Sequence, residues 1–206
     1  MRESGILMHI TSLPAPYGIG TMGKDAYAFV DFLVRAGQRY WQILPLTPTG
    51  YGDSPYQSLG ACAGNHYLID LDRLADEGLL KKEEIQNIPW GSNPARVDFG
   101  AMYAHRMNVL RLAFQRFTPD GAYETFVEQN RNWLEDYALF TALKDTLGGK
   151  PWLDWPEALR LRKADALTEK RRELSDEIRL QYFVQYEFDR QWKALRSYAN
   201  AKGVRI

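Results

Sequence analysis

The segment "YGDSPYQS", residues 51–58, combines aromatic rings with neutral hydrogen-bonding groups. It holds no cysteine or histidine for a metal and no lysine or arginine for a phosphate. A sugar ring has an apolar face of C–H groups and a rim of hydroxyls. Aromatic rings can cover that face while carboxylate, hydroxyl and amide groups bind the rim. The residues expected to do this are Tyr51, Tyr56, Asp53, Ser54 and Gln57.

Two alternatives stay open for this segment. An aromatic loop that packs on the protein core would have a similar composition. Asp53 lies between Gly52 and Ser54 and could shape the loop through an Asx-turn as readily as it could contact a ligand. The residue types therefore favour a sugar site but do not decide between these possibilities.

The segment "GIGTMGK", residues 18–24, matches two nucleotide-binding patterns on paper. Both patterns need a strand that runs directly into the glycines and then into a helix. Here "TSLPAPY" intervenes, and its prolines lack N–H donors for a phosphate. Asp25 also stands where a phosphate loop needs serine or threonine after Lys24. We therefore expect no nucleotide and no other cofactor.

Cysteine and histidine suggest no reactive or metal site. "CAGNH" brings Cys62, Asn65 and His66 together, but catalytic partners of a thiol usually come from distant parts of a chain. A buried, inert thiol is expected for Cys62. His9 is expected in the core and His105 on a solvated helix face, and no histidine pair has metal-ligand spacing.

Carboxylates form no obvious catalytic pair. Asp70 and Asp72 flank an expected helix start and are assigned to capping. The acids from 165 to 189 alternate with arginine and lysine, which is typical of a solvated helix face. No catalytic residue is assigned to this chain.

Composition narrows the class of protein. The chain has 206 residues, 45% hydrophobic, with 26 basic and 26 acidic side chains. Zero net charge argues against nucleic acid or an anionic membrane as the partner. No apolar run approaches the roughly 20 residues of a membrane span, and "MRESGILMHI" lacks the features of a signal peptide. A single cysteine permits no intrachain disulfide, so a cytoplasmic location is expected.

The elements that must position residues 51–58 follow a strand–helix–strand pattern. We expect buried strands over 5–10 and 39–46 and a helix over 24–37, in which Tyr27, Val30 and Val34 share one face. This order predicts parallel strands. The loop from 47 to about 64 then leaves the carboxyl end of the second strand, where α/β folds hold ligands.

The rest of the chain is expected to be mostly helical. "HYLIDL" is interpreted as extended, followed by a short helix that ends at Gly78. Asp98 is expected to cap a helix, and two helices are expected within 123–149. Pro156 is placed at a first helical position, and a last helix runs from Ser175 to Gly203. The apolar stripe expected on the helix after Asp98 consists of Tyr103, Met107, Leu110, Phe114 and Phe117.

"GVRI", residues 203–206, is interpreted as the start of a third strand. The fold class is therefore α/β, the amino-terminal part of a (β/α)8 barrel with a large helical insertion. The expected parts are 1–70, 71–174 and 175–206. Strands buried on both faces would leave an inner surface without its opposing layer, so self-association through strand edges is expected. The residues assigned to that inner surface are Leu7, His9, Trp41 and Ile43.

Several segments together resemble the amino-terminal region of the 4-alpha-glucanotransferases, also called amylomaltases or disproportionating enzymes. They are "TSLPAPYGIG", "QILPL", "YGDSPYQS" followed by "AGN", "WPEALRLR" and "QYFVQYEFDRQWKALRSYANAKGVRI". The resemblance covers essentially the whole chain. It departs mildly at Cys62 and His66, where the family more often has a bulky residue and a proline.

The resemblance implies a (β/α)8 barrel that transfers α-1,4-glucan segments between maltooligosaccharides with retention of configuration. The family's carboxylate motifs are absent here, so the chain alone is expected to be inactive. Tyr56 and Ser54 match positions on the donor side of the family's cleft. Tyr51 matches a position linked to a second glucan site, to which Tyr103 is also assigned. The alternative is a non-catalytic helical interaction module on a small α/β scaffold.

Overall fold

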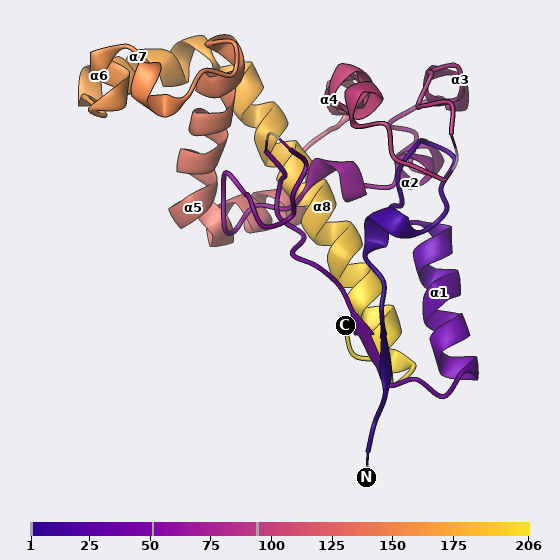
Figure 1. Ribbon diagram of the computed structural model, residues 1–206. Coiled ribbons are helices and arrows are strands. Elements are labelled where there is room, and N and C mark those ends of the chain that lie inside the picture. The colour runs from indigo at the N-terminus through magenta and orange to yellow at the C-terminus, as the bar shows by residue number, and fades with distance from the viewer. Residues whose placement is uncertain (1, 51, 94) are drawn as a thin grey trace. The chain divides into compact units, whose positions relative to one another are not determined.

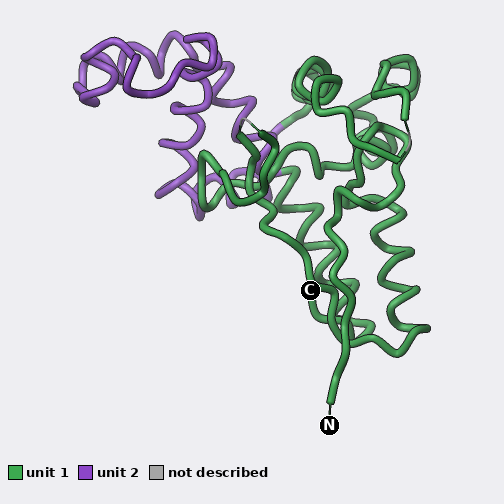
Figure 2. Tube along the Cα trace, in the orientation of Figure 1, with its two compact units in different colours: residues 1–118, 187–206 green, residues 119–186 purple. Residues whose placement is uncertain are grey.

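The computed structural model describes residues 2–50, 52–93 and 95–206. These residues form two compact units, which Figure 2 colours separately. Unit 1 consists of Met1–Thr118 and Glu187–Ile206, and unit 2 of Pro119–Tyr186. The three parts expected from the sequence stay a prediction.

Unit 1 contains a small parallel sheet. Strand β1 (Gly5–Leu7) pairs with β2 (Tyr40–Gln42) in the register Gly5↔Tyr40. The arrows of the two strands lie side by side near the N and C marks of Figure 1. On the other side of β2, Tyr40 forms a parallel bridge with Arg205. The Trp41 N–H donates to the Arg205 carbonyl at 2.8 Å. The predicted parallel pairing is confirmed, and the segment predicted to begin a third strand pairs in parallel with the second.

Both strands are shorter than predicted. One further ladder bond follows them, from the Met8 N–H to the Gln42 carbonyl at 3.0 Å. The Leu44 N–H then donates to the His9 ring nitrogen Nδ1 at 3.3 Å, so a side chain takes the place of the next backbone acceptor. Beyond it the chain turns into the 3-10 helix η1 (Ile10–Ser12). His9 is half-buried, and burial lowers the pKa of its ring.

The expectation that these strands are buried on both faces is wrong for part of the sheet. Leu7 is 58% exposed. Trp41, by contrast, is fully buried, because its ring meets Phe29 edge-to-face at 4.9 Å and its Nε1 donates to the Met8 carbonyl at 2.7 Å. Trp41 therefore packs on the helix side of the sheet and does not belong to the open inner surface predicted for it.

Helix α1 (Lys24–Arg35) links the two strands as predicted. Gly37 ends it in the left-handed conformation, φ 67°, which glycine adopts without strain. The buried positions are Ala26, Val30 and Leu33. Val34, predicted on the same face, is 41% exposed, because the buried stripe lies about one position earlier along the helix.

The glycine-rich loop before α1 has a packing role. A Cβ at Gly20 would lie 1.9 Å from the Ile10 carbonyl oxygen, and one at Gly23 would lie 1.9 Å from the Asp70 carboxylate. Thr21, buried between them, donates its hydroxyl to Asp70 Oδ2 at 2.6 Å. The glycines thus permit close approach of backbone segments.

Four short or medium elements complete unit 1 before the chain leaves it. They are η2 (His66–Leu68), α2 (Leu71–Asp76), α3 (Lys82–Gln86) and α4 (Phe99–Arg116). Asp70 caps α2 by accepting from the Arg73 N–H, and Asp98 caps α4 by accepting from the Ala101 N–H, both at 3.0 Å. Asp72 instead accepts from the Tyr17 hydroxyl at 2.6 Å. The extended conformation predicted for residues 66–71 is wrong, since η2 occupies its first half.

The predicted apolar stripe on α4 is also wrong. Of its five residues only Leu110 is buried, and Tyr103 is 56% exposed. The buried face is centred one position earlier and includes a charged residue, which an apolar pattern cannot reveal. That face consists of Met102, Arg106, Val109, Leu110 and Ala113.

Unit 2 is helical. Helix α5 (Gly121–Thr146) is continuous where two helices were predicted, because neither glycine nor proline interrupts it. It is followed by η3 (Trp152–Asp154), α6 (Glu157–Arg160), α7 (Ala164–Glu173) and the first part of α8 (Ser175–Ala201), whose remainder belongs to unit 1. Pro156 is the N-cap of α6 rather than its first residue. The core of unit 2 includes Ala138, Leu139, Ala142, Leu143, Trp155, Leu159, Leu167 and Ile178.

Four of the seven acids between 165 and 189 are exposed, as predicted for a solvated face, and several form ion pairs. Lys170 pairs with Glu173 at 2.5 Å, and Arg179 pairs with Asp176. Glu187 is the exception, because its side chain is almost fully buried and is held by Arg190 at 2.6 Å. Burial raises the pKa of Glu187 although the guanidinium opposes this.

Candidate functional site

The loop after β2 folds back on itself as a narrow hairpin. Thr49 and Ser58 form an antiparallel bridge, and the Gly50 N–H donates to the Gln57 carbonyl at 3.2 Å. Two turns close the tip: the Asp53 N–H donates to the Gly50 carbonyl and the Gln57 N–H to the Ser54 carbonyl, each at 3.1 Å. The hairpin, residues 49–58, therefore holds four of the predicted sugar-binding residues on a single short frame. Tyr51 lies outside the described residues.

Tyr56 is turned outward from this hairpin. Its side chain is 73% exposed, so the alternative in which it packs on the core is wrong. The neighbouring Gln57 is also exposed. An exposed aromatic ring beside an exposed amide is the combination that can cover a sugar ring and bind its hydroxyls.

Asp53 does not form the Asx-turn considered for it. In such a turn the carboxylate accepts from the backbone N–H two residues later, and here that residue is Pro55, which has none. Ser54 shapes the turn instead, since its Oγ accepts from the Tyr56 N–H at 3.3 Å. Asp53 adopts the left-handed conformation, φ 56°, and its buried Oδ1 has no hydrogen-bond partner among the described residues. Asp53 therefore combines an uncommon backbone conformation with an acceptor atom that has no described partner.

Tyr103 connects the hairpin to α4. Its hydroxyl donates to the Gly50 carbonyl at 3.1 Å, and its ring meets Tyr67 of η2 edge-to-face at 6.1 Å. Burial raises the pKa of Tyr103, and the adjacent Asp53 carboxylate raises it further. Tyr103 is thus brought together with the predicted loop residues, although 53 positions separate it from Gly50.

Arg106, one turn further along α4, anchors the helix to η2. Its side chain is fully buried, and Nη2 donates to the Tyr67 carbonyl at 2.9 Å and to the Ile69 carbonyl. Burial lowers the pKa of Arg106 to about 10, although the charge of Asp70 opposes the shift. Sequence reasoning missed this residue, because an arginine inside an apolar stripe looks like a solvated position.

The "CAGNH" segment has no catalytic arrangement. Cys62 is exposed, so the prediction of a buried thiol is wrong. Asn65 is buried and caps η2 by accepting from the Tyr67 N–H at 3.0 Å. His66 packs on the Tyr67 ring at 4.2 Å, and burial, with a smaller contribution from Arg106, lowers its pKa to about 3.

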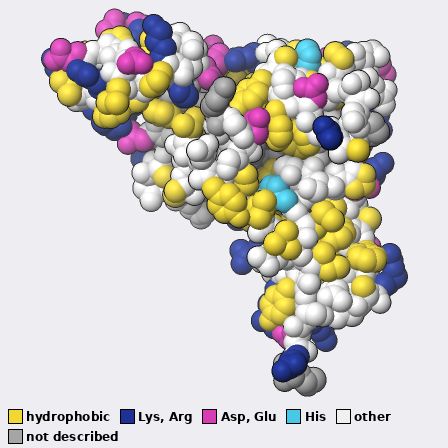
Figure 3. Space-filling model, viewed as in Figure 1, with side chains coloured by type: hydrophobic (Ala, Val, Ile, Leu, Met, Phe, Trp, Pro, Cys, Tyr) yellow, Lys and Arg dark blue, Asp and Glu magenta, His cyan; other side chains and the backbone are white. Residues whose placement is uncertain are grey.

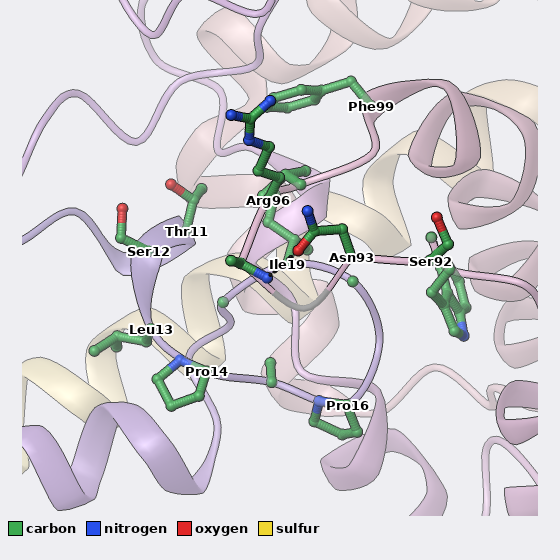
Figure 4. Close-up of a pocket in the computed structure, with 17 residues that line it drawn as sticks. Thr11, Ser12, Leu13, Pro14, Pro16, Ile19, Ser92, Asn93, Arg96 and Phe99 are labelled. Carbon is green, nitrogen blue, oxygen red and sulfur yellow. Dashed lines mark hydrogen bonds between the residues drawn. The ribbon is translucent and has the colours of Figure 1, made fainter.

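A hollow of about 790 Å³ lies between the loop around η1 and the segments 90–93 and 95–99, and sequence reasoning missed it. Figure 4 shows Thr11 and Ser12 on one side and Arg96 with Phe99 on the other. The two hydroxyl residues lie in η1, which begins three residues beyond the end of β1, so this hollow and the hairpin both lie past the carboxyl ends of the parallel strands. Phe99 also lies 6.4 Å from the Tyr67 ring that contacts Tyr103.

Neither a metal-binding group nor a membrane-spanning helix is found in the described part of the chain. Residues 2–50, 52–93 and 95–206 contain no group of three or more His, Cys, Asp or Glu side chains placed to hold a metal ion. None of the helices within the same residues has the length and apolar character needed to cross a bilayer.

The parallel strands joined by helix α1, with a loop at their carboxyl ends, place the chain in the α/β class. The solved structures agree. The chain is similar to the amylomaltase from Streptococcus agalactiae in complex with acarbose, with a TM-score of 0.95 and 45% identity over 99% of this chain and 42% of that one. A likeness to the amylomaltase from Corynebacterium glutamicum, with a TM-score of 0.70 and 18% identity, supports the fold alone.

The family follows from the sequence comparisons. A family model described as 4-alpha-glucanotransferase matches residues 8–206, and the chain belongs to this family. It is 49% identical over 211 residues to a 4-alpha-glucanotransferase from Thermus thermophilus and 46% identical over 201 residues to one from Clostridium butyricum. These matches cover 100% and 97% of this chain but 41% of each relative, so the chain spans about two fifths of their length.

Proposed function

We propose that this chain is part of a 4-alpha-glucanotransferase that passes α-1,4-glucan segments between maltooligosaccharides. In this proposal the hairpin 49–58 supplies glucan contacts on the donor side of the cleaved bond. The observation that carries the proposal is the exposed ring of Tyr56 on a hairpin that also holds the unpaired carboxylate oxygen of Asp53. The likeness to an amylomaltase solved with acarbose supports it.

Each predicted contact has a distinct task in this proposal. The face of Tyr56 covers a glucosyl ring, and the Asp53 carboxylate and the Gln57 amide bind its hydroxyls. Ser54 contributes mainly by fixing the turn, since its Oγ already accepts a backbone N–H. Tyr103 and Tyr51 are assigned to a second glucan contact, in which Tyr103 presents its ring because its hydroxyl is engaged with Gly50.

We infer that the chemistry itself depends on carboxylates other than those of this chain. Retaining transfer needs a nucleophilic carboxylate and an acid roughly 5 Å apart. The family's carboxylate motifs do not occur in these 206 residues. The contribution of the hairpin is therefore to hold the donor in a reactive position. The chain alone is expected to release no glucose from maltotriose.

The parallel strands are proposed to be the opening of a (β/α)8 barrel, with α1 as its first covering helix. The pairing order β1, β2 and then Arg205 supports this reading. The hollow beside Thr11 and Phe99 opens at the same end of the strands and offers room for further sugar rings.

Calorimetric titration of the purified chain with maltoheptaose tests the sugar contact. Tyr56→Ala should weaken binding at least about fivefold, because an aromatic contact contributes about 1 kcal/mol and its neighbours lose their positioned sugar. The melting temperature should stay nearly constant, since the ring is exposed.

Leu59→Ala is the matched control, because Leu59 follows the hairpin and is also an exposed apolar residue. Its affinity should equal that of the unsubstituted chain. Equal affinities for all three proteins would overturn the proposed contact.

A further inference from the structure

Unit 2 contains a hollow of its own, of about 270 Å³, bounded by α5, η3, α6 and α7. Its floor consists of buried apolar side chains such as Leu139 and Leu143. One wall is formed by Phe140 and Trp155, whose rings stack with centroids 5.3 Å apart. Sites for drug-sized molecules span roughly 300–1,000 Å³, so this smaller volume suits a single ring. We name it the α5–α7 hollow.

Trp152 lies at this hollow with 48% of its surface exposed. All six tryptophans of the chain lie within the described residues, and the other five are buried or half-buried. Its neighbour Trp155 is buried, and its Nε1 donates to the Lys150 carbonyl at 3.1 Å. Trp152 therefore offers a flat apolar face to solvent beside a preformed hollow.

A charged pair lines the same hollow. Nη2 of Arg162 lies 2.9 Å from both carboxylate oxygens of Asp136, and Arg171 approaches Asp136 at 3.7 Å. Both members of the closer pair are more than half exposed, and exposed ion pairs add little stability. Arg162 also adopts the left-handed conformation, φ 54°, at a helix end where glycine would be unstrained. Stability alone therefore does not account for an arginine at this position.

We propose that the α5–α7 hollow binds one glucosyl ring of an α-1,4-glucan, as a site separate from the hairpin 49–58; the choice of this sugar rests on the proposed function. The Trp152 face covers the C–H face of the ring, Asp136 accepts from its hydroxyls, and Arg162 donates to them. A purely apolar occupant would strip water from the charged pair without replacing its hydrogen bonds. A sugar replaces those bonds through its hydroxyl rim, which is the reason for preferring it.

Figure 3 shows hydrophobic and charged side chains side by side over the end of unit 2 that carries α6 and α7. A glucan held there is bound in addition to the segment at the hairpin. This second contact raises the local concentration of glucan chains around the protein.

The test is a titration with maltotriose of the 15N-labelled chain carrying Tyr56→Ala, which removes the aromatic part of the proposed hairpin contact and so weakens binding there. The indole N–H signal of Trp152 is assigned by its loss in Trp152→Phe. It should shift in a saturable manner. Asp136→Asn should weaken the affinity fitted to this signal at least about threefold, the size of a lost hydrogen-bonding contact. Trp152→Ala should weaken the affinity by at least the same factor, fitted to the indole N–H signal of Trp155, which also lines the hollow.

Leu153→Ala is the matched control, because Leu153 belongs to the same 3-10 helix and is exposed but does not line the hollow. It should bind as the parent does. Two results would overturn the proposal. One is a Trp152 signal that stays unchanged at a maltotriose concentration about 50 times the Kd measured for the hairpin. The other is a signal that shifts on concentrating the protein without sugar, which would assign the hollow to a second copy of the chain.

Discussion

Replacing Asp53 should change stability and glucan binding in opposite directions. Its left-handed conformation costs roughly 1 kcal/mol, and its buried carboxylate oxygen without a described partner costs at least about 1 kcal/mol more. Asp53→Gly removes both costs. It also makes the unfolded chain more flexible, which offsets about 0.4–1 kcal/mol. The free energy of unfolding should therefore rise by about 1 kcal/mol, which raises the melting temperature of a chain of this size by roughly 2–4 °C.

The same change should weaken maltoheptaose binding about tenfold or more. A hydrogen bond from a sugar hydroxyl to a charged acceptor contributes about 1.5–3 kcal/mol, and glycine cannot replace it. Calorimetric titration and thermal melts of the same preparations measure both effects. Asp53→Asn is the control: asparagine tolerates the left-handed conformation, keeps an acceptor oxygen and loses the charge, so its affinity should be intermediate. A lower melting temperature for Asp53→Gly, with unchanged affinity, would show that Asp53 is structural and refute the reasoning.

Three further outcomes are expected. Tyr103→Phe removes the hydrogen bond to Gly50 and should weaken maltoheptaose binding up to about fivefold, as measured by titration. The melting temperature should fall by at most about 4 °C. Unchanged affinity would show that the contact between α4 and the hairpin does not affect binding. Burial and Arg106 hold the pKa of His66 near 3, below its unfolded value, so the unfolded chain binds one more proton than the folded chain as pH falls below about 6.5. The free energy of unfolding measured in urea should therefore drop from pH 7.5 to pH 5, and His66→Gln should show a smaller drop. Identical drops for the two proteins would count against His66 as the cause. The purified chain should self-associate through the edge of β1, where Leu7 is exposed; light scattering of a clean monomer at high concentration would contradict this.

Features that depend on a few neighbouring residues were predicted well. The caps at Asp70 and Asp98 and the helix ends at Gly37 and Gly203 depend on local hydrogen bonds and on left-handed glycines. The parallel order of the strands followed from the strand–helix–strand pattern. These features carry their own signal within a few positions of the sequence.

Features that depend on tertiary packing were predicted poorly. The exposed Val34 and the buried Arg106 both lie on faces that the partner surfaces determine, and periodicity alone placed each stripe one position away. Trp41 was assigned to the wrong side of the sheet because a short apolar strand does not show which face meets the helix. Cys62 was expected in the core on the strength of its residue type, which is a statistical preference only.

The candidate site was predicted in part. The hairpin residues were found from their types, but the bond between Tyr103 and Gly50 joins segments with no local pattern in common. The left-handed conformation of Asp53 has no clear sequence signal. The absence of an Asx-turn does have one, because Pro55 cannot donate the required N–H.

A crystal structure of this chain with maltotriose would show whether the hairpin 49–58 holds a glucosyl ring. A glucosyl ring should stack on Tyr56, with carbon atoms within about 4.5 Å of the aromatic ring, and a sugar hydroxyl should lie within hydrogen-bonding distance of Asp53. A bare Tyr56 ring in crystals soaked at a concentration that saturates the chain in solution, with no lattice contact covering the hairpin, would contradict the proposed contact.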